Sequence, residues 1–202
     1  YHAITSLLRQ KVATRLPVTL LLTPDEEVGS PTSRAVIEAE ARNAAYVLIP
    51  EPAAGAGGAV VTARKGVGRF VLSVTGVAAH SGGNFDDGAS AVVELAHQIL
   101  AVNAMVDPQR GVTTNVAPIT GGTRPNVIAQ EASCEIDLRV PTVADGERVE
   151  AAILGLKPRN PRCTVSVTGA MNRPPFAENA GVLALYERAR AIAAGIGFDL
   201  PT

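Results

Sequence analysis

The chain has 202 residues and a formal net charge of -1, and 47% of its residues are hydrophobic. This balance offers no general attraction to nucleic acid or to an anionic membrane surface, and no apolar run approaches the ~20 residues of a transmembrane helix. Aromatic residues make up only 3% of the chain, so we expect a core of smaller aliphatic side chains, as in layered α/β proteins. Cys134 and Cys163 share no metal-type spacing and lie in alternating apolar stretches, which predicts two free thiols in the core.

The N-terminal part predicts a strand, a helix and a second strand in that order. The apolar runs at residues 17–23 and 45–50 are short and are typical of strands buried on both faces. Between them, residues 30–43 have the spacing of a helix, with Ser30 as its N-cap and Pro31 at its first position. Because a crossover helix joins strands that run parallel, this order predicts a βαβ unit with a parallel-type sheet.

A Gly- and Ala-rich stretch, residues 53–59, predicts a surface loop near a domain boundary. After it the pattern changes, because residues 69–76 and 132–140 alternate apolar and polar side chains. Such alternation is typical of a strand with one face on a core and the other toward solvent or a site. Helices are predicted over residues 87–105 and 142–156 from their apolar spacing.

The first of these helices has a single apolar stripe, formed by Ala89, Val92, Val93, Ala96, Ile99 and Leu100. With a last strand over residues 162–169, the order of elements becomes β, α, β, β, α, β, the split βαβ arrangement of ferredoxin-like domains. We therefore expect an α/β protein in three parts. Residues 1–62 and 171–202 would belong to one domain, and an α+β domain at residues 63–170 would be inserted between them.

Acidic residues follow both predicted strands of the N-terminal part. Asp25, Glu26 and Glu27 come directly after the first strand, and Glu51 follows the second. Ligands gather outside the carboxyl ends of parallel strands, and clustered carboxylates stay ionised when a cation compensates them. One acid could then ligate a divalent metal while its neighbour acts as general base toward a water molecule. The alternative is a solvated loop before a helix N-terminus, where acids are favourable.

Four segments occur as an ordered set: "TPDEEVGS" at residues 23–30, "PEP" at 50–52, "RKGVGRFVLSVTGVAAHSG" at 64–82 and "GGTRPNVIAQEASCEIDLRVP" at 121–141. Together they resemble the aminoacylase and glutamate carboxypeptidase family of co-catalytic zinc peptidases (metallopeptidase family twenty). The resemblance runs through essentially the whole chain. It implies part of a catalytic α/β domain with an inserted ferredoxin-like lid domain, through which the family forms homodimers.

The resemblance also implies roles for three acids. Glu26 would be the general base that activates the attacking water, and Glu27 and Glu51 would each ligate a zinc ion. Members of the family hold two zinc ions per subunit, and their other ligands, among them a His-x-Asp motif, have no counterpart in this sequence. The chain is therefore expected to be a fragment that is inactive by itself.

Four further residues take their roles from the same resemblance. His80 would reach into the active site of the partner subunit and stabilise the tetrahedral intermediate. Asn126 and Arg139 would bind the carboxylate end of the substrate, and Arg173 would assist them from the return hinge. From the residues alone, Arg139 could equally form a cross-strand ion pair, and His80 could be an ordinary surface residue in a turn of small residues.

The implied reaction is hydrolysis of the amide of a C-terminal amino acid such as glutamate, in a small peptide or an N-acyl amino acid. A carboxypeptidase and an N-acyl-amino-acid hydrolase both fit this description. Two alternatives stay open from the sequence. One is a dimerisation or interaction module without catalysis, and the other is an amidohydrolase for N-carbamoyl or ureido substrates, which shares the same lid motifs.

Overall fold

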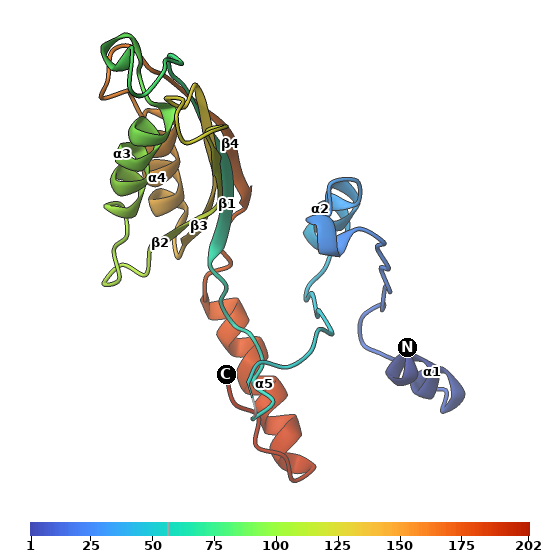
Figure 1. The fold of residues 1–202 in the computed structure, drawn as a ribbon. Helices are drawn as coiled ribbons and strands as arrows, with labels where there is room; N and C mark the ends of the chain where they lie inside the picture. Colours follow the sequence, from blue (N-terminus) through green and yellow to red (C-terminus); the bar gives the residue numbers. More distant parts are fainter. Residues whose placement is uncertain (56) are drawn as a thin grey trace. The chain divides into compact units, whose positions relative to one another are not determined.

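The computed structural model describes residues 1–55 and 57–202 and divides into two compact units, Tyr1–Glu51 and Pro52–Thr202 (Figure 1). The predicted loop at residues 53–59 includes Ala56, which lies outside the described residues. The predicted boundaries at residues 62/63 and 170/171 both fall inside the second unit and stay predictions. Among the described residues, no helix is both long and apolar enough to cross a membrane.

The first unit contains two α-helices, α1 (His2–Arg9) and α2 (Arg34–Arg42), and a short 3-10 helix, η1 (Glu26–Val28). The runs at residues 17–23 and 45–50 are not strands in the structure, so the prediction of two parallel strands there is wrong. The described residues form one sheet, which has four strands and belongs to the second unit.

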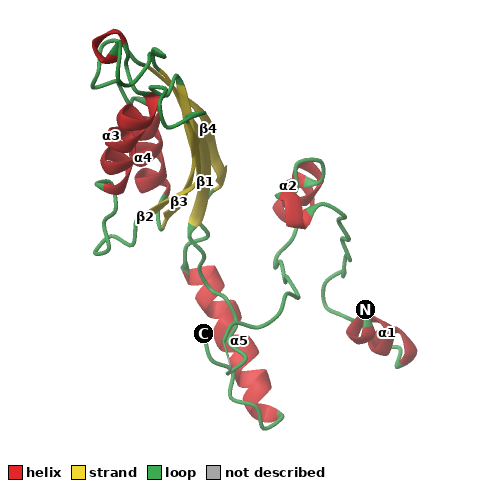
Figure 2. Cartoon of the chain, viewed as in Figure 1, coloured by secondary structure: helices red, strands yellow, loops and turns green. Residues whose placement is uncertain are grey.

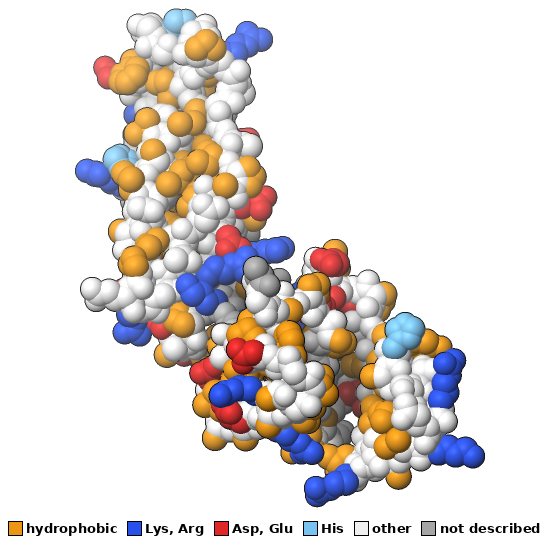
Figure 3. All heavy atoms as spheres, turned by 90° about the horizontal axis from the view of Figure 1, so that it is seen from below, with side chains coloured by type: hydrophobic (Ala, Val, Ile, Leu, Met, Phe, Trp, Pro, Cys, Tyr) orange, Lys and Arg blue, Asp and Glu red, His pale blue; other side chains and the backbone are white. Residues whose placement is uncertain are grey.

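These two runs are unpaired because a strand gains its hydrogen bonds from its neighbours. Two strands joined by one crossover helix are marginal in water, and strands buried on both faces need a packed layer on each side. Leu22 and Ile49, one in each run, are 81% and 76% exposed. Figure 3 shows hydrophobic side chains at the surface on the face that it presents.

Asp25 fixes the turn between η1 and α2. Its carboxylate accepts hydrogen bonds from the backbone amides of Thr32 and Ser33, at 2.8 and 3.1 Å, and from their hydroxyls, at 2.7 and 2.5 Å. Because these bonds keep both residues in the turn, α2 begins three residues later than predicted, with Ser33 at its N-cap. Ser30, the predicted N-cap, instead has a left-handed φ of 58°.

The second unit contains the inserted α+β fold that the sequence predicts. Its strands are β1 (Gly66–Thr75), β2 (Thr113–Gly121), β3 (Glu131–Val140) and β4 (Thr164–Arg173), in the sheet order β2-β3-β1-β4. All neighbouring pairs are antiparallel. This is the ferredoxin-like arrangement, so the predicted fold class is confirmed for this domain.

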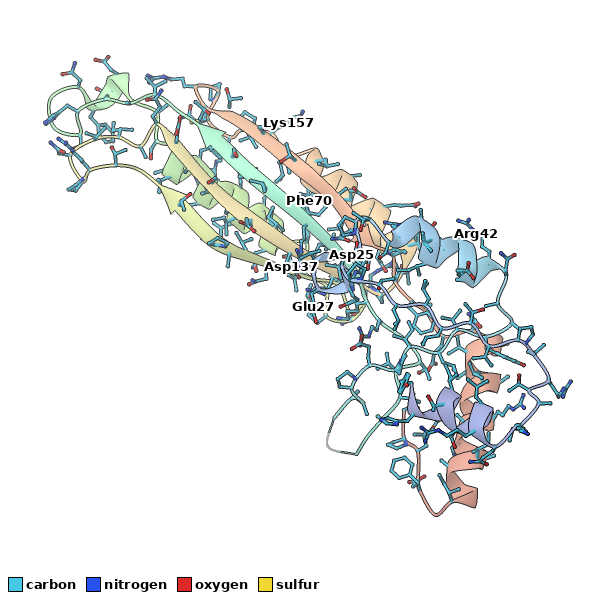
Figure 4. The ribbon with its side chains drawn as sticks, turned by 90° about the vertical axis from the view of Figure 1, so that its right-hand side faces the viewer. Asp25, Glu27, Arg42, Phe70, Asp137 and Lys157 are labelled. Carbon is cyan, nitrogen blue, oxygen red and sulfur yellow. The ribbon has the colours of Figure 1, made fainter. Side chains whose placement is uncertain are left out.

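Two helices, α3 (Ala91–Asn103) and α4 (Val143–Leu154), cover one face of the sheet, and no helix from the described residues of the second unit covers the other face (Figures 1 and 2). The strands therefore alternate between buried and solvent-facing side chains. In Figure 4, Phe70 of β1 belongs to the buried face, where it is 1% exposed, whereas Asp137 of β3 belongs to the open face. Both Cys134 and Cys163 are free and buried in this core, as predicted.

Helix α3 buries a different stripe from the apolar one that its sequence shows. Its buried residues are Ala91, Glu94, Leu95, Gln98 and Val102. The predicted stripe is largely solvent-facing instead, because Val93 and Leu100 are 57% and 66% exposed. Polar side chains of α3, Glu94 and Gln98, therefore face the core, while these two apolar side chains face solvent. Both orientations need a physical explanation.

The inward-facing polar pair joins α3 to the segment that leads into β4. Glu94 accepts hydrogen bonds from the backbone amides of Arg159 and Asn160, both at 2.8 Å, and from the Gln98 side-chain amide at 2.6 Å. Gln98 in turn donates to the carbonyl oxygen of Lys157 at 2.9 Å. Burial opposes ionisation of Glu94, but the three donors outweigh it and hold the pKa of this carboxyl below its ordinary value.

Helix α4 begins with a reciprocal cap. Asp145 donates its amide to the Thr142 hydroxyl at 3.1 Å, and the same hydroxyl donates to the Asp145 carboxylate at 2.7 Å. Arg110 and Arg148 reach the other carboxylate oxygen at 2.8 and 3.2 Å. The Thr142 hydroxyl first, and then both guanidinium groups, lower the pKa of Asp145 from 3.8 to about 2.

Helix α5 (Ala180–Gly195) follows β4 in the chain. The segments before and after this helix contact the segment that leads into β1. Arg64 and Phe176 form an antiparallel bridge, and the Thr62 hydroxyl donates to Glu178 at 2.5 Å. The amide of Val60 donates to the carbonyl of Pro201 at 3.0 Å. The entry and exit segments of the α+β domain are thus tied to one another at the end of the sheet where β1 begins and β4 ends.

We expect Glu94→Gln to lower the free energy of unfolding by about 2 kcal/mol, within the range for losing a hydrogen bond to a buried charged group. The Gln side chain keeps one acceptor oxygen but turns an amide group toward a backbone N–H. Urea unfolding at neutral pH measures the change, with Glu147→Gln on the exposed face of α4 as the matched control. Equal stabilities for the two variants would show that the Glu94 network is not stabilising.

Asp145 predicts a pH dependence of stability. Because the pKa of Asp145 is lowered from 3.8 to about 2 in the folded chain, its stabilisation is complete above about pH 4 and is lost as the pH falls toward 2. Wild type should therefore exceed Asp145→Asn in unfolding free energy at pH 7, and this difference should shrink between pH 4 and pH 2. A difference that stays constant over that interval would contradict the assignment.

Candidate functional site

His80 and Asn126 are brought together at one end of the sheet. The loop after β1 and the loop before β3 pair as antiparallel backbone, with a bridge between His80 and Val127. The amide of Ser81 donates to the carbonyl of Asn126 at 3.0 Å, and the amide of Ile128 donates to the carbonyl of Ala79 at 2.9 Å. Both His80 and Asn126 are exposed, so this end of the domain, called the tip below, presents an imidazole beside a carboxamide.

The imidazole of His80 is held by its own turn. Its Nδ1 accepts hydrogen bonds from the backbone amides of Gly82 and Gly83, both at 3.1 Å. The amide of Asn84 closes the turn on the His80 carbonyl at 3.1 Å. Small residues allow the amides to approach the ring this closely, and the sequence motif "AAHSGG" supplies them. The ring is thereby exposed but fixed, which the sequence pattern alone does not reveal.

Arg139 lies at the opposite end of the sheet. The register pairs Thr75 with Glu131 at the tip end and Val67 with Arg139 at the other. Eight residues of strand separate Glu131 from Arg139, which corresponds to about 26 Å. The structure therefore does not bring Arg139 into the neighbourhood of His80 and Asn126 of the same chain.

The ion pair of Arg139 runs along its strand. Its Nε and Nη2 atoms donate to the two carboxylate oxygens of Asp137 at 2.7 and 3.0 Å. The predicted alternative of a cross-strand pair is thus replaced by a pair two residues apart on the same open face. A guanidinium has five N–H groups, so this pair leaves three for another acceptor, and it fixes the plane of the fork that would bind a carboxylate.

Arg173 lies in the same cross-strand row of the sheet as Arg139. It is the last residue of β4 and pairs with Val67, the residue that pairs with Arg139 on its other side. A register shift follows at once between Val67 and Gly68. Arg139 and Arg173 therefore flank one β1 residue, Val67, at the end of the sheet where β1 begins.

The acids of the first unit occupy a loop and a 3-10 turn. Glu26 and Glu27 open η1 and are exposed, and Glu51 is exposed at the end of the unit. Asp25 is the exception, because hydroxyls and amides of Ser33 and Thr32 surround its carboxylate and lower its pKa well below the ordinary range. Sequence reasoning gave Asp25 no separate task, because its partners lie seven and eight residues later in the chain.

These residues do not amount to a zinc site. Within the two described stretches, no three His, Cys, Asp or Glu side chains come together in a way that could hold a metal ion. Catalytic zinc takes three protein ligands, commonly with imidazole or thiolate among them. The predicted ligands of this chain, Glu27 and Glu51, are both carboxylates. Carboxylate oxygens can ligate zinc, but these two residues alone do not complete a zinc site.

A second surface of the domain combines α3 with the edge strand β2. Ala96 and Ile99 of α3 line a shallow groove together with Gly121 of β2. Around it, Val92 and Val93 are 43% and 57% exposed, and Leu100 and Ile119 are 66% and 56% exposed. Because β2 has β3 on one side only, its other edge is open. We call this exposed apolar surface the α3–β2 face.

Comparison with known proteins gives a match of residues 62–156 to the peptidase dimerisation domain family. Carboxypeptidase G2 from Pseudomonas sp. (strain RS-16) is 30% identical over 179 residues, which are 86% of this chain and 42% of that protein. The chain thus spans less than half the length of this curated relative.

Two solved structures share the fold. Aminopeptidase PepT from Bacillus cereus has a TM-score of 0.77 at 21% identity, covering 99% of this chain and 53% of its own. A hydantoinase/carbamoylase family amidase from Burkholderia ambifaria has a TM-score of 0.54 at 22% identity, covering 70% of this chain and 36% of its own. The dimerisation-domain match, the carboxypeptidase relative and this shared fold together place the chain in the aminoacylase and glutamate carboxypeptidase family (metallopeptidase family twenty), which its sequence motifs resemble.

Proposed function

We propose that this chain supplies general-base, oxyanion-binding and substrate-binding residues to an exopeptidase or amidohydrolase that cleaves the amide of a C-terminal amino acid such as glutamate. The observation that carries the proposal is the tip, where backbone pairing between two loops at the end of the sheet brings His80 beside Asn126. The 30% identity to a carboxypeptidase supports the choice of reaction class. The substrate would be a small peptide or an N-acyl amino acid.

Glu26 is the proposed general base. Glu26 is exposed at the start of η1. The preceding residue, Asp25, accepts hydrogen bonds from the backbone amides of Thr32 and Ser33, and these bonds limit the motion of the loop that carries Glu26. A carboxylate in this position could take a proton from the attacking water and return it to the leaving amine. Glu27 and Glu51 are the proposed zinc ligands of this chain, and the described residues do not complete that site.

The separation of the tip from Arg139 has a consequence for assembly. A C-terminal amino acid places its carboxylate within a few ångströms of its scissile amide, whereas about 26 Å of strand separates Glu131, at the tip end of β3, from Arg139. One chain cannot therefore place His80 on the amide and Arg139 on the carboxylate of the same molecule. We propose that two subunits share each site, so that His80 and Asn126 act across a homodimer and Arg139 acts in its own subunit.

The α3–β2 face is the proposed dimer contact. It combines an open strand edge with exposed apolar side chains of α3, so a second copy could add to the sheet while covering the helix stripe. Such a contact explains why α3 turns Val93 and Leu100 outward, because an interface buries apolar groups that a monomer would expose. The match of residues 62–156 to a peptidase dimerisation domain supports a dimer contact within this domain.

A second candidate function is dimerisation without catalysis. It is favoured by one observation, namely that the α3–β2 face is fully formed whereas the described residues bring no metal site together. Under this reading, the chain would associate with itself and turn over no substrate. Action on N-carbamoyl or ureido substrates is a variant of the main proposal, and substrate profiling separates it from peptide hydrolysis.

We expect Val93→Glu to weaken self-association of the chain by roughly tenfold or more, because it buries a charge at the centre of the proposed contact. Val143→Glu is the matched control, since Val143 is 56% exposed, close to the 57% of Val93, and both lie in the first turn of a helix. Sedimentation analysis over a concentration series gives the dissociation constants. A wild-type chain that stays at 20.8 kDa would refute the dimer.

In protein that contains this chain and hydrolyses an N-acyl glutamate, Glu26→Gln should lower kcat by about 10²- to 10⁴-fold, the usual contribution of a general base. Bound metal, measured by elemental analysis, should stay unchanged because Glu26 is not one of the proposed ligands. Glu40→Gln on the exposed surface of α2 is the control. Full activity in Glu26→Gln would contradict the assignment, and absence of hydrolysis in metal-loaded wild type would favour the second candidate.

A further inference from the structure

The hydrogen bonds around His80 determine which of its ring nitrogens carries the proton. Nδ1 lies 3.1 Å from the amide nitrogens of both Gly82 and Gly83, and each of these amides is a donor. A neutral imidazole has one N–H and one acceptor nitrogen. Since Nδ1 accepts from two amides, the proton belongs on Nε2.

We propose that Gly82 and Gly83 are positioning residues that fix His80 as an Nε2–H donor. The proposal deepens the proposed function, on which it rests for the identity of the reacting group. A fixed Nε2–H at an exposed tip is suited to donate to an oxygen that gains negative charge, such as the carbonyl oxygen of an amide under attack. His80 would then be an electrophilic donor in the reaction.

The same geometry excludes two other roles for this ring. A general base must accept a proton, and a metal ligand must offer a lone pair at the exposed nitrogen Nε2. Either role would require moving the ring proton to Nδ1, where it would face both glycine amides. His80 is therefore neither a metal ligand nor a general base in this proposal, and Glu26 remains the proposed base.

The space around the turn does not itself require glycine at these two positions. An added Cβ at Gly82 would lie 3.5 Å from Cε1 of His80, and one at Gly83 would lie 3.8 Å from Nδ1. Both are ordinary contact distances, so alanine fits at either position and keeps the amide. Proline would remove the amide donor itself, which gives a matched pair of variants that separates the donor from the side chain.

Long-range ¹H–¹⁵N spectra of the chain labelled with ¹⁵N-histidine test the proposal directly. At alkaline pH, where each imidazole carries one proton, Nδ1 of His80 should show a pyridine-type shift and Nε2 a pyrrole-type shift. His2 is the internal reference, because the described residues offer no hydrogen bond to either of its ring nitrogens and its two shifts should be averaged between tautomers. Averaged shifts for His80, or a pyrrole-type Nδ1, would overturn the proposal.

The variants test the cause. The double variant Gly82→Ala with Gly83→Ala should keep the single tautomer, and Gly82→Pro with Gly83→Pro should move the His80 shifts toward the averaged values of His2. Unchanged methyl signals of the core residues Leu72 and Leu95 verify that the sheet stays folded. A pure Nε2–H tautomer in the folded proline variant would show that the two amides are not responsible.

This measurement is independent of turnover. If His80 is a fixed Nε2–H donor but metal-loaded protein hydrolyses no amide, the positioning inference stands and the proposed function fails. If hydrolysis is found and depends on Glu26 but His80 shows averaged tautomers, the proposed function stands and the positioning inference fails.

Discussion

The pairing of β1 with β3 is the constraint on which the rest of the α+β domain depends. Ten consecutive residue pairs, from Gly66–Val140 to Thr75–Glu131, fix this register. Because the strands are antiparallel, the loops that leave one end carry His80 and Asn126, while the other end carries Arg139 and the hinge. A slip by one residue would also exchange the buried and open faces. The distance between His80 and Arg139 of one chain is thus set by the backbone hydrogen bonds of this pairing.

Helix α3 shows how one element can serve the core and a surface at once. Its inner side buries Glu94, which costs free energy unless donors surround it, and the amides of Arg159 and Asn160 supply them. This network locks the helix to the segment before β4 and so decides its rotation. With the rotation fixed, the apolar side chains of Val93 and Leu100 face outward, where they can serve the proposed contact with a second copy.

Much of the fold could be predicted from the sequence, and the failures have definite causes. Alternation at residues 132–140 predicted a strand with one buried face, and β3 spans Glu131–Val140. The runs at residues 17–23 and 45–50 had equally good patterns but formed no strands. Alternation depends on neighbours a few residues away, whereas a parallel strand depends on partners that its own sequence does not specify. The N-cap of α2 failed similarly, because Asp25 acts across seven residues.

By itself, the sequence determined the ferredoxin-like order of elements, the buried thiols and the residue types at each candidate position, because these follow from local periodicity and from ordered motifs. Only the tertiary structure decided which residues meet. It set His80 beside Asn126, held Arg139 on Asp137 at the far end of the sheet, and turned the apolar stripe of α3 outward. The position of each residue depends on strand register, and the rotation of α3 depends on buried hydrogen bonds between distant segments, such as Glu94 and Asn160. Such contacts produce no periodic pattern in the sequence.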